Sequence, residues 1–313
     1  MKEHNKIWCH LFLYAVVTVA MLGMAAATEN GGTPYPAGVD TVMPALNPKP
    51  GETMIFNYNN FYTAYENVNS NGKNVVPNFG VRVYATAFKV IHTWDLHVLG
   101  GDLQTNAAFP FVYQRLRTPD GTHDQFALGN VQFAPLGVGY HLGKEHNFHL
   151  NYEVAAFFPG TAYSKYNPVN IGQHYYSLGP DASFTWLPKK GKYELSSKFT
   201  YLVNFNDVST NYQNGQQFSW EFDGMREVNR KIALGINGYW FQQTTDDRIN
   251  NVIVGDGNRR RTVSIGPEMR INLPHGGCAF KYTRDVDVQN AARGDSFWFQ
   301  WGLPIRFGGH AEK

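Results

Sequence analysis

Charged side chains recur at alternate positions of several extended segments, where they could form ion pairs or line a polar passage. Residues two apart in a β-strand share one face. In the segment 193–205, Glu194 and Lys198 share a polar face opposite Leu195 and Phe199. The residues that we select on this basis as candidates for lining an enclosed interior carry both signs: Arg82, Glu153, Asp181, Glu194, Lys198, Glu221, Asp223, Glu268, Arg270, Lys281 and Arg306. Similar numbers of acids and bases favour paired charges over a one-sign ion filter.

Hydrolysis is a second chemical possibility. A nucleophilic Ser and a His base on neighbouring strands could act together, and His149 and Ser177 lie in segments that we expect to be neighbours. However, the sequence contains no sharp nucleophile turn and no Gly-rich oxyanion segment after a Ser. We therefore expect that the protein is not an enzyme and has no catalytic residues.

Eleven histidines raise the question of a metal site. His92 and His97, or His146 and His149, have a tolerable spacing, but no Cys or carboxylate cluster with ligand spacing accompanies them. We interpret them as solvated or interfacial side chains, and we expect no metal and no cofactor.

The run Arg259-Arg260-Arg261 could bind phosphate groups of an outer-leaflet glycolipid through charge-assisted hydrogen bonds. The alternative is a solvated loop edge whose charge is balanced by Asp246, Asp247 and Asp256. The sequence leaves both interpretations open.

All these candidates depend on strands that follow one another along most of the chain. In the segment 294–307, Phe297, Phe299 and Trp301 fall on one face, opposite Ser296 and Gln300. We predict twelve strands with this kind of alternation, at residues 52–66, 78–91, 104–115, 126–141, 147–158, 175–187, 192–206, 216–228, 231–243, 261–273, 277–286 and 295–308. Most exceed the ~9–11 residues that a tilted strand needs to cross a membrane. A soluble sandwich or propeller, the alternative, would have shorter strands.

The connections between these strands alternate in length. Short turns at 143–146, 188–191, 229–230 and 274–276 alternate with long loops at 67–77, 159–174, 207–215 and 244–260. Outer-membrane β-barrels have short periplasmic turns and long external loops. The connection 92–103 is long where a short turn is expected, so it either holds an extension or marks a wrong strand boundary.

The composition of the 313 residues fits a lipid-facing surface. Aromatic residues make up 15% and charged residues 17%, against the ~25% charged residues of typical soluble domains. A net charge of +2 gives no reason to expect a nucleic-acid partner.

The N-terminal region predicts export. Two lysines, an apolar stretch and Ala25-Ala26-Ala27 predict a signal peptide at residues 1–27. Residues 28–51 are rich in Gly, Pro and Thr, so they should form neither a regular helix nor a central strand. This leader is either a periplasmic segment or a plug inside a barrel. The barrel itself should span residues 52–308, followed by a tail at 309–313.

Several motifs of the mature chain resemble a known family. They are the leader Glu29-Asn30-Gly31-Gly32-Thr33-Pro34-Tyr35-Pro36-Ala37-Gly38, Pro50-Gly51 before the segment 56–62, Leu99-Gly100-Gly101 and Ala107-Ala108-Phe109-Pro110. The sequence from about residue 29 to 308 resembles the SphA-like family, labelled "putative MetA-pathway of phenol degradation". The resemblance implies an exported outer-membrane channel associated with phenols and other aromatic or hydrophobic compounds.

The sequence thus predicts an all-β, antiparallel up-and-down transmembrane β-barrel in the outer membrane of a Gram-negative bacterium. We expect passive uptake of small hydrophobic or aromatic solutes, and we expect the barrel to contact outer-membrane lipids and the barrel-assembly machinery. The alternatives are a non-conducting structural or adhesion barrel and an outer-membrane lipid hydrolase.

Overall fold

The computed structural model describes residues 32–143, 145, 147–273 and 276–305, so the predicted signal peptide and the C-terminal tail lie outside the described residues. Twelve strands form a closed antiparallel ring, each hydrogen-bonded to the next and the last to the first. In ring order they are β1 (Thr53–Val68), β2 (Gly80–Val98), β3 (Gly101–Thr118), β5 (Gln132–Leu142), β6 (Phe148–Phe157), β7 (Ser177–Trp186), β8 (Tyr193–Asn204), β10 (Gln217–Asn229), β11 (Ile232–Gln243), β14 (Arg261–Leu273), β15 (Gly276–Gln289) and β16 (Ala291–Ile305). The predicted twelve-stranded barrel is confirmed.

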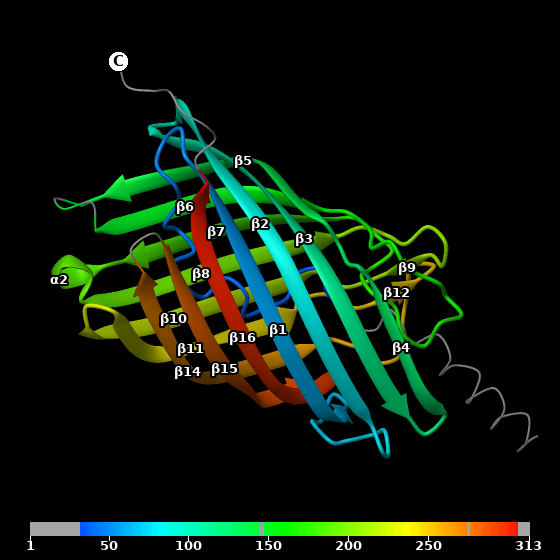
Figure 1. Cartoon of the computed structure of the whole chain (residues 1–313). Helices are drawn as coiled ribbons and strands as arrows, with labels where there is room; N and C mark the ends of the chain where they lie inside the picture. The colour runs from blue at the N-terminus through cyan, green and yellow to red at the C-terminus, as the bar shows by residue number, and fades with distance from the viewer. Residues whose placement is uncertain (1–31, 144, 146, 274–275, 306–313) are drawn as a thin grey trace, which may run out of the picture.

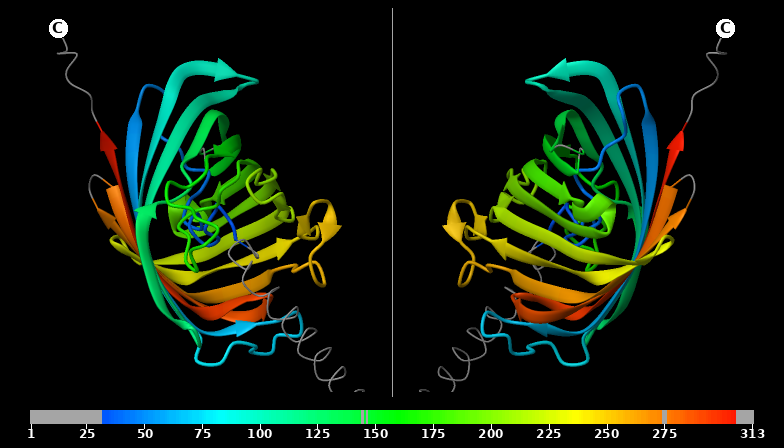
Figure 2. Two further views of the ribbon diagram at one scale, coloured as in Figure 1. Left: turned by 90° about the vertical axis from the view of Figure 1, so that its right-hand side faces the viewer. Right: turned by 90° about the vertical axis from the view of Figure 1, so that its left-hand side faces the viewer.

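The first and last strands close the barrel. The pairing of β1 with β16 runs from Thr53 opposite Ile305 to Val68 opposite Ala291. Figure 1 shows these two strands side by side. Figure 2 shows the barrel turned by 90° in either direction, so that first one end and then the other faces the viewer. Closure satisfies the backbone donors and acceptors of the wall within the sheet, which a membrane-spanning structure requires.

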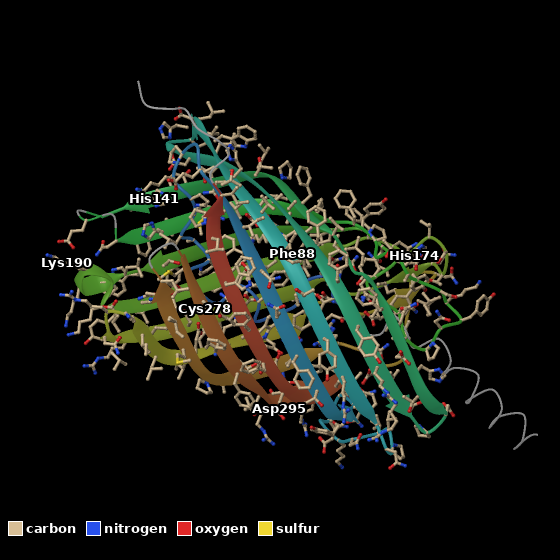
Figure 3. The ribbon with its side chains drawn as sticks, viewed as in Figure 1. Phe88, His141, His174, Lys190, Cys278 and Asp295 are labelled. Carbon is tan, nitrogen blue, oxygen red and sulfur yellow. The ribbon has the colours of Figure 1, made fainter. Side chains whose placement is uncertain are left out.

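The two faces of the wall differ as the alternation predicts. Phe297 and Leu303 on β16 are 45% and 44% exposed on the outside, whereas Trp298 between them is 5% exposed and faces the lumen. Figure 3 shows Phe88 along the wall, with His141 and Lys190 toward one end of the barrel and His174 toward the other. An apolar exterior around a largely polar interior is the pattern of an outer-membrane barrel, and it excludes the sandwich alternative. No helix within the described residues is long and apolar enough to span a membrane.

The long connection at 92–103 was predicted because the ends of the two flanking strands were placed wrongly. β2 continues to Val98 and β3 begins at Gly101, so the connection is the two-residue turn Leu99-Gly100. Both residues have positive φ, 53° and 80°, as a tight hairpin turn with two left-handed residues requires. Short turns, including α2 (Pro188–Gly191), therefore connect the strands at one end of the barrel. The long loops lie at the other end, together with two tight turns, Pro119-Asp120 and Asn290.

The segment predicted as one strand at 126–141 is two strands in the structure. β4 (Gly121–Leu128) pairs with the second half of β3, and β5 pairs with its first half. Between them, Asn130 turns its side chain to the backbone of the following long loop, donating to Phe158 O at 2.8 Å and accepting from Gln173 N at 2.6 Å. These contacts replace the sheet pairing that the break removes. The long loops also form a small sheet of β9 (Tyr212–Gln213), β12 (Arg248–Ile249) and β13 (Val252–Ile253).

Candidate functional site

Residues 32–51, which we call the leader, run through the barrel lumen from one end to the other. At the long-loop end, Gly32 O accepts hydrogen bonds from Asn214 Nδ2 at 3.0 Å and from Gln217 Nε2 at 2.7 Å. At the short-turn end, Gly51 N donates to Thr93 O at 2.8 Å, directly before β1 begins. Figure 2 shows this segment, in blue, inside the ring of strands. The leader thus contacts inward-facing groups of the wall near both ends of the barrel.

The Tyr-Pro-Ala-Gly part of the leader is shaped by its surroundings. Gly38 has a φ of 91°, which favours glycine, and a Cβ atom there would lie 3.0 Å from Cδ1 of Tyr239. Tyr35 packs edge-on against Phe157 with ring centroids 6.4 Å apart. The aromatic residue and the glycine thus fix the leader against two strands of the wall, β6 and β11.

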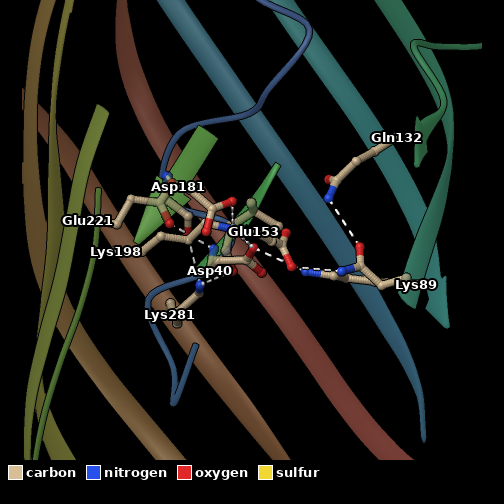
Figure 4. Close-up of polar contacts among 11 residues, drawn as sticks. Asp40, Lys89, Gln132, Glu153, Asp181, Lys198, Glu221 and Lys281 are labelled. Atoms are coloured by element: carbon tan, nitrogen blue, oxygen red, sulfur yellow. Dashed lines mark hydrogen bonds and ion pairs between the residues drawn. The ribbon is translucent and has the colours of Figure 1, made fainter. Parts of the chain in front are cut away.

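An ion-pair network joins the leader to three strands (Figure 4). Asp40 Oδ2 lies 2.9 Å from Nζ of Lys198 on β8 and 3.4 Å from Nζ of Lys89 on β2. Lys198 also lies 3.2 Å from Oδ2 of Asp181 on β7. The Asp40 carboxylate is buried, and the two lysines balance its negative charge within the network.

Two further charged side chains bind the leader backbone. The Glu221 carboxylate accepts from Gly38 N at 2.7 Å and from Asp40 N at 2.9 Å. Lys281 Nζ donates to Gly38 O at 2.7 Å, to Val39 O at 3.1 Å and to Thr41 Oγ1 at 3.0 Å. An acid on β10 and a base on β15 thus satisfy the polar groups of a segment that has no sheet partners.

The second half of the leader has its own contacts with the wall. Glu194 forms an ion pair with Arg270, and its Oε1 accepts from Met43 N at 3.1 Å. Ala45 N donates to Thr185 Oγ1 at 3.3 Å, and Asn47 Nδ2 donates to Asn151 Oδ1 at 3.2 Å. The contacts continue from the middle of the lumen to its short-turn end.

The remaining predicted acids are also buried in the interior. Glu153 Oε2 accepts from Asn106 Nδ2 at 2.8 Å, and Asn106 in turn accepts from Gln132 Nε2 at 3.2 Å. Asp223 on β10 and Glu268 on β14 are 4% and 3% exposed, electrostatic neighbours of Glu194 and Arg270. Around Arg270 the buried acids outnumber the buried bases, so the interior charges do not all form acid–base pairs.

Two candidates do not join this set. Arg82 is exposed and shares its face of β2 with the outward Tyr84 and Phe88, so the structure corrects its assignment to the lumen. Arg306 lies outside the described residues. The sequence reasoning also missed Lys89 and Asp40. Tyr84 and Phe88, at even positions of the strand, indicate which face is outward, so Lys89 at an odd position could have been assigned to the lumen. No comparable pattern in the sequence pointed to Asp40.

The candidate hydrolytic pair is separated by the sheet register. His149 lies opposite Thr185, and Ser177 lies opposite Phe157, eight positions away along the paired strands β6 and β7. Eight residues of strand span about 27 Å, so these two side chains cannot form a catalytic dyad. Ser177 Oγ instead donates to Asn204 Oδ1 at 2.7 Å.

The histidine pairs considered as metal ligands do not form a shared site. His92 Nδ1 lies 2.8 Å from Thr53 Oγ1, and His97 Nδ1 lies 2.7 Å from Asp102 Oδ1. His149 instead contacts His141, with 2.6 Å between the two Nδ1 atoms, and His146 lies outside the described residues. Within the described ranges there is no group of three or more His, Cys, Asp or Glu that could hold a metal ion.

The arginine run at the end of the longest loop is engaged with this chain's own side chains. Arg259 Nε lies 2.7 Å from Asp246 Oδ1, and Arg261 Nη2 lies 2.8 Å from Asp287 Oδ2. The Arg260 guanidinium lies 4.8 Å from the ring centroid of Phe241. These contacts favour the interpretation of a charge-balanced loop edge.

Comparison with known proteins supports the assignment of the fold. A family model described as "Putative MetA-pathway of phenol degradation" matches residues 65–301. The chain is similar to the crystal structure of the COG4313 outer membrane channel from Pseudomonas putida F1, with a TM-score of 0.73 and 14% identity over 83% of this chain and 98% of that one.

Two further solved structures match with lower scores. A Pseudomonas aeruginosa FadL homologue matches with a TM-score of 0.37 and 11% identity over 90% of this chain and 96% of that one. The β-domain of the Bordetella autotransporter BrkA matches with a TM-score of 0.46 and 11% identity over 82% and 100%. No curated protein matches the chain.

Proposed function

Because this chain belongs to the family described as "Putative MetA-pathway of phenol degradation", we propose that it is an outer-membrane channel for passive uptake of small hydrophobic or aromatic compounds. The observation that carries the proposal is a segment without sheet partners, the leader, lying along the axis of a closed barrel. A barrel wide enough to hold an extra chain segment has the width for a solute once that segment moves. The leader would then act as the gate.

The contacts of the leader suit a reversible gate. They are discrete hydrogen bonds and ion pairs from side chains such as Glu221, Lys198 and Lys281, and not strand pairing with the wall. Lys198 also has a partner on the wall, Asp181, that stays in place when the leader moves. Displacement of the leader therefore leaves a polar, hydratable lumen and not bare hydrophobic surface.

The lumen also holds an aromatic surface that could accept an aromatic solute. Tyr58, Phe157 and Trp298 are buried in one cluster together with Tyr35 and Val39 of the leader. If the leader moves, these wall aromatics lose a partner ring that a phenol-type solute could replace. The family description points to the same class of compound. In its membrane the barrel would contact outer-membrane lipids, and the barrel-assembly machinery would insert it.

The experiment is solute uptake into liposomes that contain the purified full chain, with protein-free liposomes as the baseline. A panel of phenols, alkanes and sugars separates the solute classes. We expect phenol uptake to exceed the baseline and sugar uptake to remain at it. Equal rates with and without protein for every solute would support the alternative of a non-conducting structural barrel, and sugar uptake equal to phenol uptake would contradict the solute class.

A further inference from the structure

Three arginines form a cluster on the outer surface of the barrel wall, near the end that carries the long loops. Arg82 on β2 is the direct cross-strand partner of Arg115 on β3, and Arg117 lies opposite Gly80. All three are exposed, and strand parity puts them on the outward face. With Thr63 and Tyr65, this arginine cluster lines a depression of about 290 Å³. In Figure 1 the ends of β3 and β4 lie together at this end of the wall.

The arginine cluster is positioned by the protein but not neutralised by it. Arg117 Nε donates to Asn78 O at 3.0 Å. Gly80 leaves room for the guanidinium, because a Cβ there would lie 3.3 Å from Arg117 Nη2. Among the described residues, no carboxylate lies within 4 Å of any of the three guanidinium groups, although Asp124 is the cross-strand partner of Arg115. Positive charge on a lipid-facing surface is unfavourable unless an anion accompanies it.

An aromatic groove continues from the cluster toward the middle of the membrane. On each strand the next outward residue after an arginine is a tyrosine, Tyr84 after Arg82 and Tyr113 before Arg115. The Tyr84 ring lies 6.2 Å from Tyr113 and 4.8 Å from Phe61, centroid to centroid. The groove has a volume of about 400 Å³, and the rings that line it are Phe61, Tyr84, Phe111, Tyr113, Phe126, Phe297 and Phe299. Phosphate-binding groups thus adjoin an apolar trough along the direction of a lipid molecule.

We propose that this surface binds one molecule of a phosphorylated glycolipid of the outer leaflet. The arginine cluster holds the phosphate groups, and the aromatic groove holds an acyl chain. Guanidinium groups bind phosphate through paired, charge-assisted hydrogen bonds. A lipid that carries phosphate groups is therefore favoured over an uncharged lipid. Three guanidinium groups exceed the need of a single phosphodiester, which favours a bisphosphorylated headgroup. The proposal does not depend on the transport function.

The test is native mass spectrometry of the delipidated full chain titrated with bisphosphorylated lipid A. The variant Arg82→Gln/Arg115→Gln/Arg117→Gln removes the cluster. The matched control, Arg226→Gln/Arg230→Gln/Lys231→Gln, removes the same charge from exposed residues at the short-turn end. We expect one tightly bound lipid, a loss of affinity of about tenfold or more in the cluster variant, and little change in the control. The single variants Arg82→Gln and Arg115→Gln should each give a partial loss, which keeps the test valid if the triple variant does not fold.

Two further measurements test the two halves of the site. Phe126→Ala should weaken binding of lipid A but not of its deacylated bisphosphorylated sugar. Monophosphorylated lipid A should bind more weakly than the bisphosphorylated form. Equal losses in the cluster variant and the control, or equal affinity for phosphatidylglycerol and lipid A, would overturn the proposal.

Discussion

Replacing the carboxylate of Asp40 should weaken the binding of the leader to the inner wall of the barrel. In the variant Asp40→Asn, the ion pairs with Lys198 at 2.9 Å and Lys89 at 3.4 Å are lost. Breaking a buried ion pair by removing one partner costs ~3–5 kcal/mol when the other charge is left alone. Lys198 keeps Asp181 at 3.2 Å, so we take a smaller value, about 2–3 kcal/mol. That energy corresponds to roughly a 30- to 150-fold increase in the ratio of displaced to bound leader.

Single-channel recording in planar bilayers measures this ratio as the fraction of time spent in the higher-conductance state. The matched control is Asp95→Asn, the same chemical change at an exposed residue of β2 outside the leader. The control should behave as the unmodified protein. If Asp40→Asn and Asp95→Asn gave the same open fraction as the unmodified chain, the idea that the buried ion pairs hold the leader in place would be refuted.

Two other predictions concern the wall itself. Phe88→Arg places a charge on the lipid-facing wall and should destabilise the barrel by ~2–4 kcal/mol in urea unfolding from vesicles, and an unchanged midpoint would place Phe88 away from lipid. Arg270→Met leaves Glu194 buried without its partner and should lower the free energy of unfolding by ~3–5 kcal/mol. The double variant Arg270→Met/Glu194→Met should recover much of that loss. Equal instability of the two variants would argue against the ion pair.

The barrel could be predicted from the sequence because its signal is periodic and repeated. The alternation in segments such as 193–205 separates Leu195 and Phe199 from Glu194 and Lys198, and the structure keeps that separation. Errors arose where periodicity is weak. Polar and charged residues at 92–98 hid the continuation of β2 down to the turn at Leu99-Gly100, since nothing in an isolated strand end distinguishes it from a loop.

The lumen was only partly predictable, because it depends on a segment with no periodic pattern. Strand parity identified Lys198, Glu221 and Lys281 as interior residues, but not what they bind. Their partners are backbone atoms and Asp40 of the leader, whose path through the barrel is set by many single contacts over long sequence distances. Arg82 shows a second kind of error. We assigned it to the lumen because it is charged, although it shares its face of the strand with Tyr84 and Phe88, which face outward.

The most direct test of the account compares the bilayer conductance of the mature chain with that of a form lacking residues 28–51. The leader contacts the inner wall from Gly32 to Asn47, so its removal should convert a low-conductance barrel into one with a larger and more stable open current. A folded, inserted deletion form whose conductance equals that of the full mature chain would contradict the central claim that the leader occupies the path through the barrel.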